Sequence, residues 1–164
     1  MIKKDIKILA IETSCDETAS SVLSGQLGDK PKFKLLSSVV KSQIEIHQKF
    51  GGVLPEVAAR AHMQNILPVV EKGLHDAKTK LREIDYIAVT SGPGLVVSLV
   101  VGTEFAKGLS LAGNIPLLPT NHMEGHLYSA FGDPSIAKGK VEVQFPVLSV
   151  IVSGGHTMLV IMTD

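Results

Sequence analysis

The chain has 164 residues, of which 45% are hydrophobic and 20% are charged, with 16 basic side chains balancing 16 acidic ones. A domain of this size buries roughly 70% of its unfolded surface and needs no metal or disulfide to form a core. The balanced charge argues against a protein that wraps a polyanion through many phosphate contacts, and the single cysteine, Cys15, excludes an internal disulfide and a Cys-x-x-Cys metal site.

The apolar segments are too short for a membrane span. The longest runs, at residues 95–101 and 145–152, are interrupted by a serine or a proline and fall far short of the roughly 20 residues required. The basic start of the chain loses its apolar character at Glu12, too early for the core of a signal peptide. We therefore expect a soluble, cytoplasmic protein that does not associate with membranes.

The first part of the chain predicts three short strands. Residues 6–13 form an apolar run typical of a buried strand, and the polar turn 14–17 follows it. Residues 18–23 and 35–42 are β-branched runs separated by glycines and a proline. This spacing predicts three consecutive antiparallel strands.

After Gly51 and Gly52 the pattern changes to that of helices. Residues 55–77 place small and apolar side chains at helical spacing, with Glu56 near the positive end of the helix dipole. Strands and helices then alternate: we expect a strand at 84–90, a helix at 95–112, a strand at 116–120 and a helix at 122–131. The Gly-Pro-Gly at 92–94 lacks the lysine of a P-loop and predicts a tight strand-to-helix turn.

This order of elements predicts an α/β fold. Three antiparallel strands followed by alternating helices and strands match one lobe of the actin-like ATPase (ribonuclease-H-like) fold. The polar stretch 132–144 predicts a linker, and two strands at 145–152 and 157–163 predict a hairpin. We expect a first actin-like lobe at 1–131 and the start of a truncated second lobe at 145–164.

Two histidines, His122 and His126, stand one helical turn apart directly after a predicted strand. Side chains at this spacing lie on one helix face, about 5–6 Å apart at Cβ, and can share one metal ion. The carboxyl edge of the sheet is also where α/β proteins place ligands. A zinc protease motif needs glutamate directly after the first histidine, and Glu124 stands one residue too late. A pair of surface histidines remains the alternative.

Two hydroxyl-rich turns follow the first strands of the two expected lobes. Residues 12–18 (ETSCDET) combine hydroxyls with carboxylates, and residues 153–157 (SGGHT) offer hydroxyls and accessible backbone amides. Actin-like enzymes hold a nucleotide between two such turns. A solvated acidic turn and an ordinary glycine hairpin are the alternatives. His47, His62 and His75 have no clustered partner in the sequence, and we interpret them as surface or packing residues.

Five motifs in chain order resemble those of the bacterial TsaD family, which makes threonylcarbamoyladenosine in tRNA and was formerly described as an O-sialoglycoprotein endopeptidase, or glycoprotease. The motifs are IETSCDETA (11–19), GGVLPEVAARAH (51–62), SGPGL with SLVVG (91–102), NHMEGH (121–126) and VSGGHT (152–157). The resemblance covers essentially the whole chain, which corresponds to the N-terminal half of a typical member.

The resemblance implies a transferase that moves a threonylcarbamoyl group from threonylcarbamoyl-AMP to N6 of adenosine 37 in tRNAs reading ANN codons. It implies one divalent metal ion per subunit, held by His122 and His126 with an aspartate of the second lobe. Imidazole with carboxylate suits iron (Fe2+) or zinc better than magnesium, and iron is favoured. The substrate-binding residues implied by the match are Ile151, Val152, Ser153, Gly154 and Gly155.

The resemblance also implies partners: tRNA, a TsaB-like paralogue docked on the helices at 55–77 and 95–112, and a TsaE-like ATPase. We expect a bulky charge at Ala61 to disrupt the TsaB-like contact and to leave the lobe folded. Because an isolated hairpin is marginal in water, we expect the 164-residue chain alone to be inactive. A metallopeptidase of the glycoprotease type and a non-catalytic scaffold paralogue are the alternative functions.

Overall fold

The computed structural model describes residues 5–27, 32–132, 143–152 and 157–163. The chain divides into two compact units, Met1–His122 and Met123–Asp164, and each is described here by itself. Most of the predicted linker at 132–144 lies outside the described residues. The predicted lobe boundaries, at residues 131 and 145, are therefore not tested by the structure.

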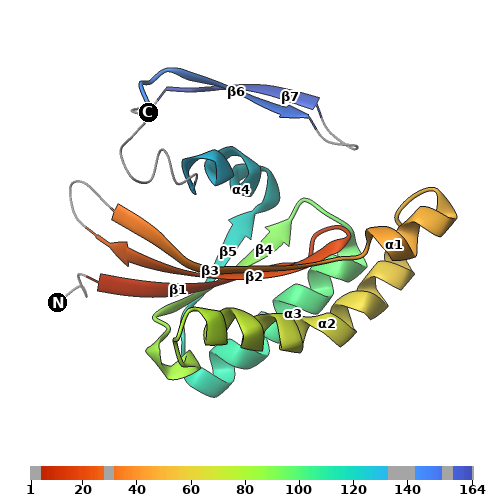
Figure 1. Ribbon diagram of the computed structural model, residues 1–164, viewed down its shortest axis with the longest axis horizontal. Helices are drawn as coiled ribbons and strands as arrows, with labels where there is room; N and C mark the ends of the chain where they lie inside the picture. The colour runs from red at the N-terminus through yellow and green to blue at the C-terminus, as the bar shows by residue number, and fades with distance from the viewer. Residues whose placement is uncertain (1–4, 28–31, 133–142, 153–156, 164) are drawn as a thin grey trace. The chain divides into compact units, whose positions relative to one another are not determined.

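A five-stranded sheet forms the centre of the first unit (Figure 1). Its strands are β1 Asp5–Glu12, β2 Glu17–Gln26, β3 Lys32–Ser42, β4 Tyr86–Gly92 and β5 Leu117–Asn121. They lie in the order β3-β2-β1-β4-β5, in which β1, β2 and β3 are antiparallel and β1, β4 and β5 are parallel. This topology confirms the prediction of three antiparallel strands followed by strands that alternate with helices.

Two long helices lie side by side on one face of this sheet (Figure 1). Within the described residues the helices are α1 Ile44–His47, α2 Pro55–Asp76, α3 Val96–Gly113 and α4 His122–Ser129, with 3-10 turns at Gln48–Phe50, Leu81–Glu83 and Ala130–Gly132. α2 packs on β2 and β3, and α3 packs on β4. The Gly-Pro-Gly segment joins β4 to α3, as predicted.

The core lies between the sheet and these two helices. Alternate residues of the central strands, Leu9 and Ile11 in β1 and Ile87 and Val89 in β4, are almost fully buried. They pack with apolar side chains of the helices and β2, which include Val22, Ile66, Val70 and Ala106. Burial of each large aliphatic side chain stabilises the fold by about 1.5–3 kcal/mol, so this layer fixes the positions of the strand ends.

α3 has two different faces. Its buried residues are Ser98, Gly102 and Ala106, all small, which let the helix approach the sheet closely. On the outer side Val96 and Val100 are 74% and 50% exposed. By length and composition α3 is long and apolar enough to cross a membrane, with a mean hydropathy of 1.3 over 18 residues. This differs from the sequence-based expectation that the apolar segments are too short for a span. One such helix is weak evidence, because the core helix of a soluble protein meets the same criterion.

The expectation for Ala61 needs correction. Ala61 is 6% exposed and belongs to the core, so a bulky charge there would have to enter the packed layer under α2. Such a variant would disturb the fold as well as any partner contact. The exposed apolar side chains of α2 are Met63 and Leu67, one turn apart.

The second unit contains the predicted hairpin. Its strands are β6 Val147–Val152 and β7 Thr157–Met162, which pair antiparallel from Val147 with Met162 to Val152 with Thr157. The connecting residues 153–156 lie outside the described part of the chain. β6 begins two residues later than predicted, directly after Pro146, which has no backbone N–H for the ladder.

Candidate functional site

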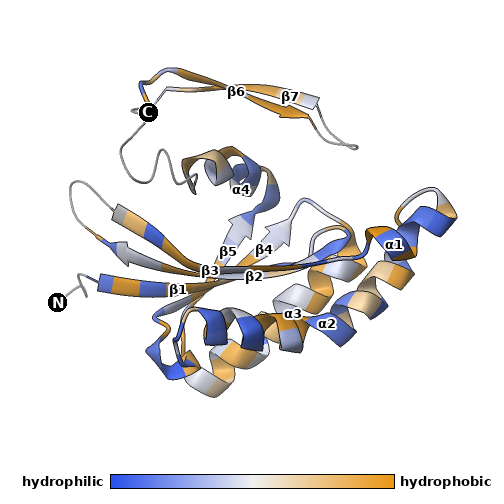
Figure 2. Ribbon diagram, in the orientation of Figure 1, coloured by the Kyte–Doolittle hydropathy of each residue, from blue (hydrophilic) through white to orange (hydrophobic). Residues whose placement is uncertain are grey.

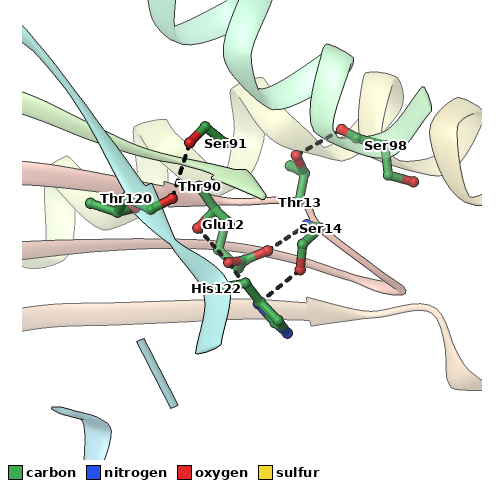
Figure 3. Close-up of polar contacts among 8 residues, drawn as sticks. All are labelled: Glu12, Thr13, Ser14, Thr90, Ser91, Ser98, Thr120 and His122. Atoms are coloured by element: carbon green, nitrogen blue, oxygen red, sulfur yellow. Dashed lines mark hydrogen bonds and ion pairs between the residues drawn. The ribbon is translucent and has the colours of Figure 1, made fainter. Parts of the chain in front are cut away.

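Four side chains gather where three neighbouring parallel strands end. Glu12 is the last residue of β1, Thr90 stands near the end of β4, and His122 directly follows β5. Because β1, β4 and β5 are adjacent and parallel, their carboxyl ends meet at one edge of the sheet. Ser14, in the turn after β1, completes what we call the edge cluster (Figure 3).

Glu12 is the hub of the edge cluster. Its Oε2 accepts a 2.5 Å hydrogen bond from the Thr90 hydroxyl, and its Oε1 accepts one from the backbone N–H of Ser14. The same Oε2 lies 3.3 Å from Nδ1 of His122, and the Ser14 hydroxyl lies 3.0 Å from that nitrogen. The side chains of Glu12 and His122 are 33% and 21% exposed, so the cluster is partly open to solvent.

Glu12 is a carboxylate at neutral pH. Burial, the largest single influence, would raise the pKa of Glu12, but hydrogen bonds from Ser14 and Thr90 and the nearby His122 together hold this pKa below its ordinary value. An ionised carboxylate only accepts hydrogen bonds. The edge cluster therefore carries a fixed negative charge next to His122.

The turn after β1 is held against the first half of α3. The Thr13 hydroxyl donates a 2.8 Å hydrogen bond to the Ser98 carbonyl (Figure 3). A Cβ on Gly94 would stand 2.6 Å from the carbonyl oxygen of Ser14, and one on Gly102 would overlap the Thr13 hydroxyl. Glycine at these two positions lets the α3 backbone approach the turn, which fixes where Ser14 lies.

A second polar group, which we call the buried cluster, supports the same turn from the other side. It consists of Thr18, Gln43, His47 and His62, none of which is more than 4% exposed. Nδ1 of His62 lies 2.8 Å from the Thr18 hydroxyl, and its Nε2 lies 3.1 Å from the carbonyl oxygen of Cys15. Gln43 bridges the two histidines, with Nε2 3.2 Å from Nδ1 of His62 and Oε1 3.0 Å from Nε2 of His47.

His62 of the buried cluster is uncharged at neutral pH. Burial lowers the pKa of His62, and the bond to the Cys15 carbonyl and the charges of Glu12 and Asp16 only partly oppose this. His62 is thus a neutral imidazole that links α2 to the turn after β1. The interpretation of His47 and His62 as packing residues is confirmed by their burial.

The structure places the sequence-predicted site residues on two elements. His122 and His126 both belong to α4, one turn apart, as the spacing predicts. Ile151 and Val152 are the last two residues of β6. Ser153, Gly154 and Gly155 lie outside the described residues.

The two histidines fit a transition metal by their chemistry. Imidazole nitrogens suit iron and zinc, and one helical turn is a common spacing for two ligands of one ion. Within the described ranges, no group of three His, Cys, Asp or Glu side chains lies close enough to hold an ion. The described residues therefore offer two of the ligands that such a site needs.

The sequence predicts a role for Glu12 only as part of a hydroxyl-rich turn. It carries no local signal for Thr90 or for the contact of Glu12 with His122, two residues that lie 110 positions apart. The available signal was topological: residues that follow adjacent parallel strands meet at one edge. Applied to the ends of β1, β4 and β5, that rule finds Glu12, Thr90 and His122 together.

The chain matches a known family. Residues 34–164 match the family model for TsaD, tRNA N6-adenosine threonylcarbamoyltransferase. The chain is 46% identical over 157 residues to the tRNA N6-adenosine threonylcarbamoyltransferase of Fusobacterium nucleatum, which covers 96% of this chain and 42% of that protein. It is 48% identical over 158 residues to the protein of that name from Dehalococcoides mccartyi, which covers 96% and 45%. The chain thus spans less than half the length of these relatives.

Solved structures agree on the fold. YeaZ from Pseudomonas aeruginosa matches with a TM-score of 0.53 at 21% identity, over 77% of this chain and 50% of that one. An uncharacterised protein with similarity to peptidase YeaZ, also from Pseudomonas aeruginosa, matches with a TM-score of 0.57 at 17% identity, over 94% and 63%. These likenesses confirm the actin-like fold class. By the family match and the identity to curated relatives, the chain belongs to the TsaD family of tRNA N6-adenosine threonylcarbamoyltransferases.

Proposed function

We propose that this chain forms the first lobe of an enzyme that transfers a threonylcarbamoyl group from threonylcarbamoyl-AMP to N6 of adenosine 37 in tRNAs reading ANN codons. The observation that carries the proposal is the match of residues 34–164 to the transferase family model, a stretch that includes both histidines of α4. The enzyme would act in the cytoplasm, where its tRNA is found.

The reaction needs positioned partial charges more than a strong nucleophile. The N6 amine attacks the carbamoyl carbonyl, a C–N bond forms, the bond to the AMP phosphate oxygen breaks, and the amine loses a proton. A metal at His122 and His126, when bound, would stabilise negative charge that develops on the carbonyl or phosphate oxygen. We propose that Ile151, Val152, Ser153, Gly154 and Gly155 bind the adenylate.

The edge cluster would orient the ring of His122. Glu12, Ser14 and Thr90 form an interconnected hydrogen-bond network around the ring of His122. Two hydrogen bonds hold the turn that carries Ser14: one joins Thr13 to the Ser98 carbonyl of α3, and the other joins the Cys15 carbonyl to His62 of the buried cluster. Rigid placement is what a transferase supplies, since errors of about 1 Å can cost on the order of a hundredfold in rate.

The exposed apolar side chains of α2 and α3 support a protein partner. Met63 and Leu67 on α2, and Val96 and Val100 on α3, are at least half exposed and stand one turn apart on each helix. Figure 2 shows hydrophobic residues along the ribbons of both helices. We propose that they dock a TsaB-like paralogue, and that a TsaE-like ATPase joins the same assembly. Charged substitutions for testing this contact belong at Met63 or Leu67, because Ala61 is buried.

The 164-residue chain by itself would be a poor catalyst. Two histidines without further protein ligands hold an ion weakly, and the described residues supply no third ligand close to them. We propose iron (Fe2+) as the favoured metal and zinc as the other candidate. The curated relatives described above carry the name of a transferase, which favours this activity over the glycoprotease alternative.

A chimaera tests the proposal. The chain replaces the matching segment of the transferase from Listeria innocua, to which it is 46% identical over 162 residues. The chimaera, its partners, threonylcarbamoyl-AMP and tRNA are incubated, and modified adenosine is measured by mass spectrometry of nucleosides. We expect modification by the chimaera, at least a hundredfold less by the chain alone, and none by the His122→Ala chimaera. A folded chimaera that leaves tRNA unmodified while the Listeria enzyme modifies it would contradict the proposal.

A further inference from the structure

We propose that Glu12 is a positioning residue for His122: its carboxylate holds the proton of the imidazole on Nδ1 and thereby presents Nε2 as the nitrogen that binds a metal. This inference rests on the proposed role of His122 as a ligand. Glu12 is not itself proposed as a metal ligand, and it lies on β1 rather than on α4. It would decide which nitrogen of His122 binds the metal and how the His122 ring is oriented.

Two side chains of the described residues lie close to Nδ1 of His122. Oε2 of Glu12 lies 3.3 Å away and the Ser14 hydroxyl 3.0 Å away. A carboxylate has no proton to give, so a favourable contact with Glu12 requires that Nδ1 carries the hydrogen. The Ser14 hydroxyl can accept from the same N–H and adapts to either ring form. Glu12 is therefore the group that selects the tautomer.

The consequence for metal binding follows from the chemistry of imidazole. A neutral ring has one nitrogen that carries hydrogen and one lone pair for a metal, and the hydrogen bond of the first decides the identity of the second. Figure 3 shows the second ring nitrogen of His122 pointing away from Glu12 and Ser14. A carboxylate behind the ring also raises the basicity of the ligand nitrogen.

Glu12 is itself held in place from two sides. The Thr90 hydroxyl donates to Oε2 over 2.5 Å, and the backbone N–H of Ser14 donates to Oε1. These two donors come from β4 and from the turn after β1, so the carboxylate is fixed relative to the ends of both strands. Thr90 is thus a further support, whose hydroxyl matters through Glu12 rather than by contact with the ring.

The first experiment reads the tautomer directly. The 164-residue chain is labelled with 15N in histidine, and two-bond 1H–15N correlation spectra are recorded at a pH where the rings are neutral. We expect the Nδ1–H form for His122. In Glu12→Gln the side-chain amide can donate as well as accept, so we expect a mixture or the Nε2–H form. Glu71→Gln, an exposed change on α2, is the matched control and leaves the spectrum of His122 unchanged.

The second experiment adds Zn2+ alone to the same samples. We expect Zn2+ to shift the Nε2 resonance of His122, and Glu12→Gln to weaken the apparent affinity tenfold to a hundredfold. Thr90→Ser keeps the hydroxyl and should retain the affinity of the original chain, whereas Thr90→Val should lose part of it. Amide spectra of each variant verify that the chain remains folded, and Glu12→Asp replaces Glu12→Gln if the latter unfolds.

The outcomes separate this inference from the proposed function. The Nε2–H form in the original chain, or a Zn2+ shift at Nδ1, would overturn the role of Glu12 while leaving His122 a metal ligand. An Nδ1–H ring that stays unshifted even in an excess of Zn2+ sufficient to saturate a weak two-histidine site would remove His122 from the metal site, and with it both the proposed ligand role and the purpose assigned to Glu12.

Discussion

Two histidine clusters flank the turn after β1, and they differ in burial and charge. His62 of the buried cluster is fully buried, and its nitrogens contact the Thr18 hydroxyl, the Gln43 amide and the Cys15 carbonyl, none of them charged. His122 of the edge cluster is 21% exposed and faces the carboxylate of Glu12. A neutral histidine that is shielded from water contributes to stability. A histidine that contacts a carboxylate at the carboxyl edge of a sheet has the surroundings of a ligand-binding residue.

The largest expected effect is the loss of stability on removing the buried histidine. His62→Ala leaves a cavity and strands the polar atoms of Thr18 and Gln43, so we expect a loss of about 3 kcal/mol in the free energy of unfolding. His122→Ala, at the partly open edge, should cost about 1 kcal/mol or less. Urea unfolding of both variants measures the difference. Equal losses would remove the structural distinction between the clusters.

The next largest effect is on the pH dependence of stability, to which His62 of the buried cluster and Glu12 of the edge cluster contribute at different pH. Burial depresses the pKa of His62 below 6.5, so the unfolded chain binds its proton first and stability is lost as the pH falls from 6.5. The hydrogen-bonded Glu12 also has a depressed pKa, but its contribution is lost only as the pH falls below 4.5.

Urea midpoints measured between pH 8 and pH 4 test this order. One proton contributes a slope of at most about 1.4 kcal/mol per pH unit. His62→Gln should flatten the curve below pH 6.5. The exposed change Gln64→Ala on α2, which removes no titratable group, is the control. A His62→Gln curve that still falls as steeply would mean that other groups cause the loss.

A smaller effect is expected where α3 clamps the turn between the clusters. The Ser98 hydroxyl is buried and has no hydrogen-bond partner among the described residues, although its carbonyl accepts from Thr13. Ser98→Ala removes this unsatisfied group and should stabilise the chain by about 1 kcal/mol. The control is Ser37→Ala, which loses a 2.7 Å bond to the Gly73 carbonyl and should destabilise by a similar amount. Thermal unfolding of the pair tests the opposite signs.

The smallest effect on stability is expected at Met63, which is 69% exposed and takes no part in the hydrogen bonds of either cluster. Met63→Glu should change the free energy of unfolding by less than about 0.5 kcal/mol and abolish binding of a TsaB-like partner in calorimetry. Ala61→Glu should unfold the chain instead, because it places a charge in the core. Retained partner binding by Met63→Glu would move the interface elsewhere.

The fold was largely predictable because its signals are local. The apolar run of β1 and the helical spacing in α2 and α3 each predict an element within a few residues of its observed bounds. α1 was missed because it has only four residues and no side-chain cap. Its start is set instead by a tertiary bond, from the Gln43 N–H to the Asp16 carbonyl.

The site was predictable only in part. The one-turn spacing of His122 and His126 is visible in the sequence, because both lie on one helix. The contact of Glu12 with Thr90 joins residues 78 positions apart and depends on the strand order, which no spacing reveals. The wrong expectation that Ala61 is exposed has a related cause. Because α2 carries apolar residues on two sides, its sequence does not reveal which side packs on the sheet.

The dependence of tRNA modification on metal concentration tests the central claim, that the edge cluster prepares His122 to bind a metal. The chimaera with the Listeria enzyme is assayed over a range of Fe2+ and Zn2+ concentrations, with Glu12→Gln and Glu71→Gln forms in parallel. The account predicts that Glu12→Gln needs tenfold to a hundredfold more metal for half of its maximal rate, with Glu71→Gln unchanged. An equal metal requirement for all three forms would contradict it.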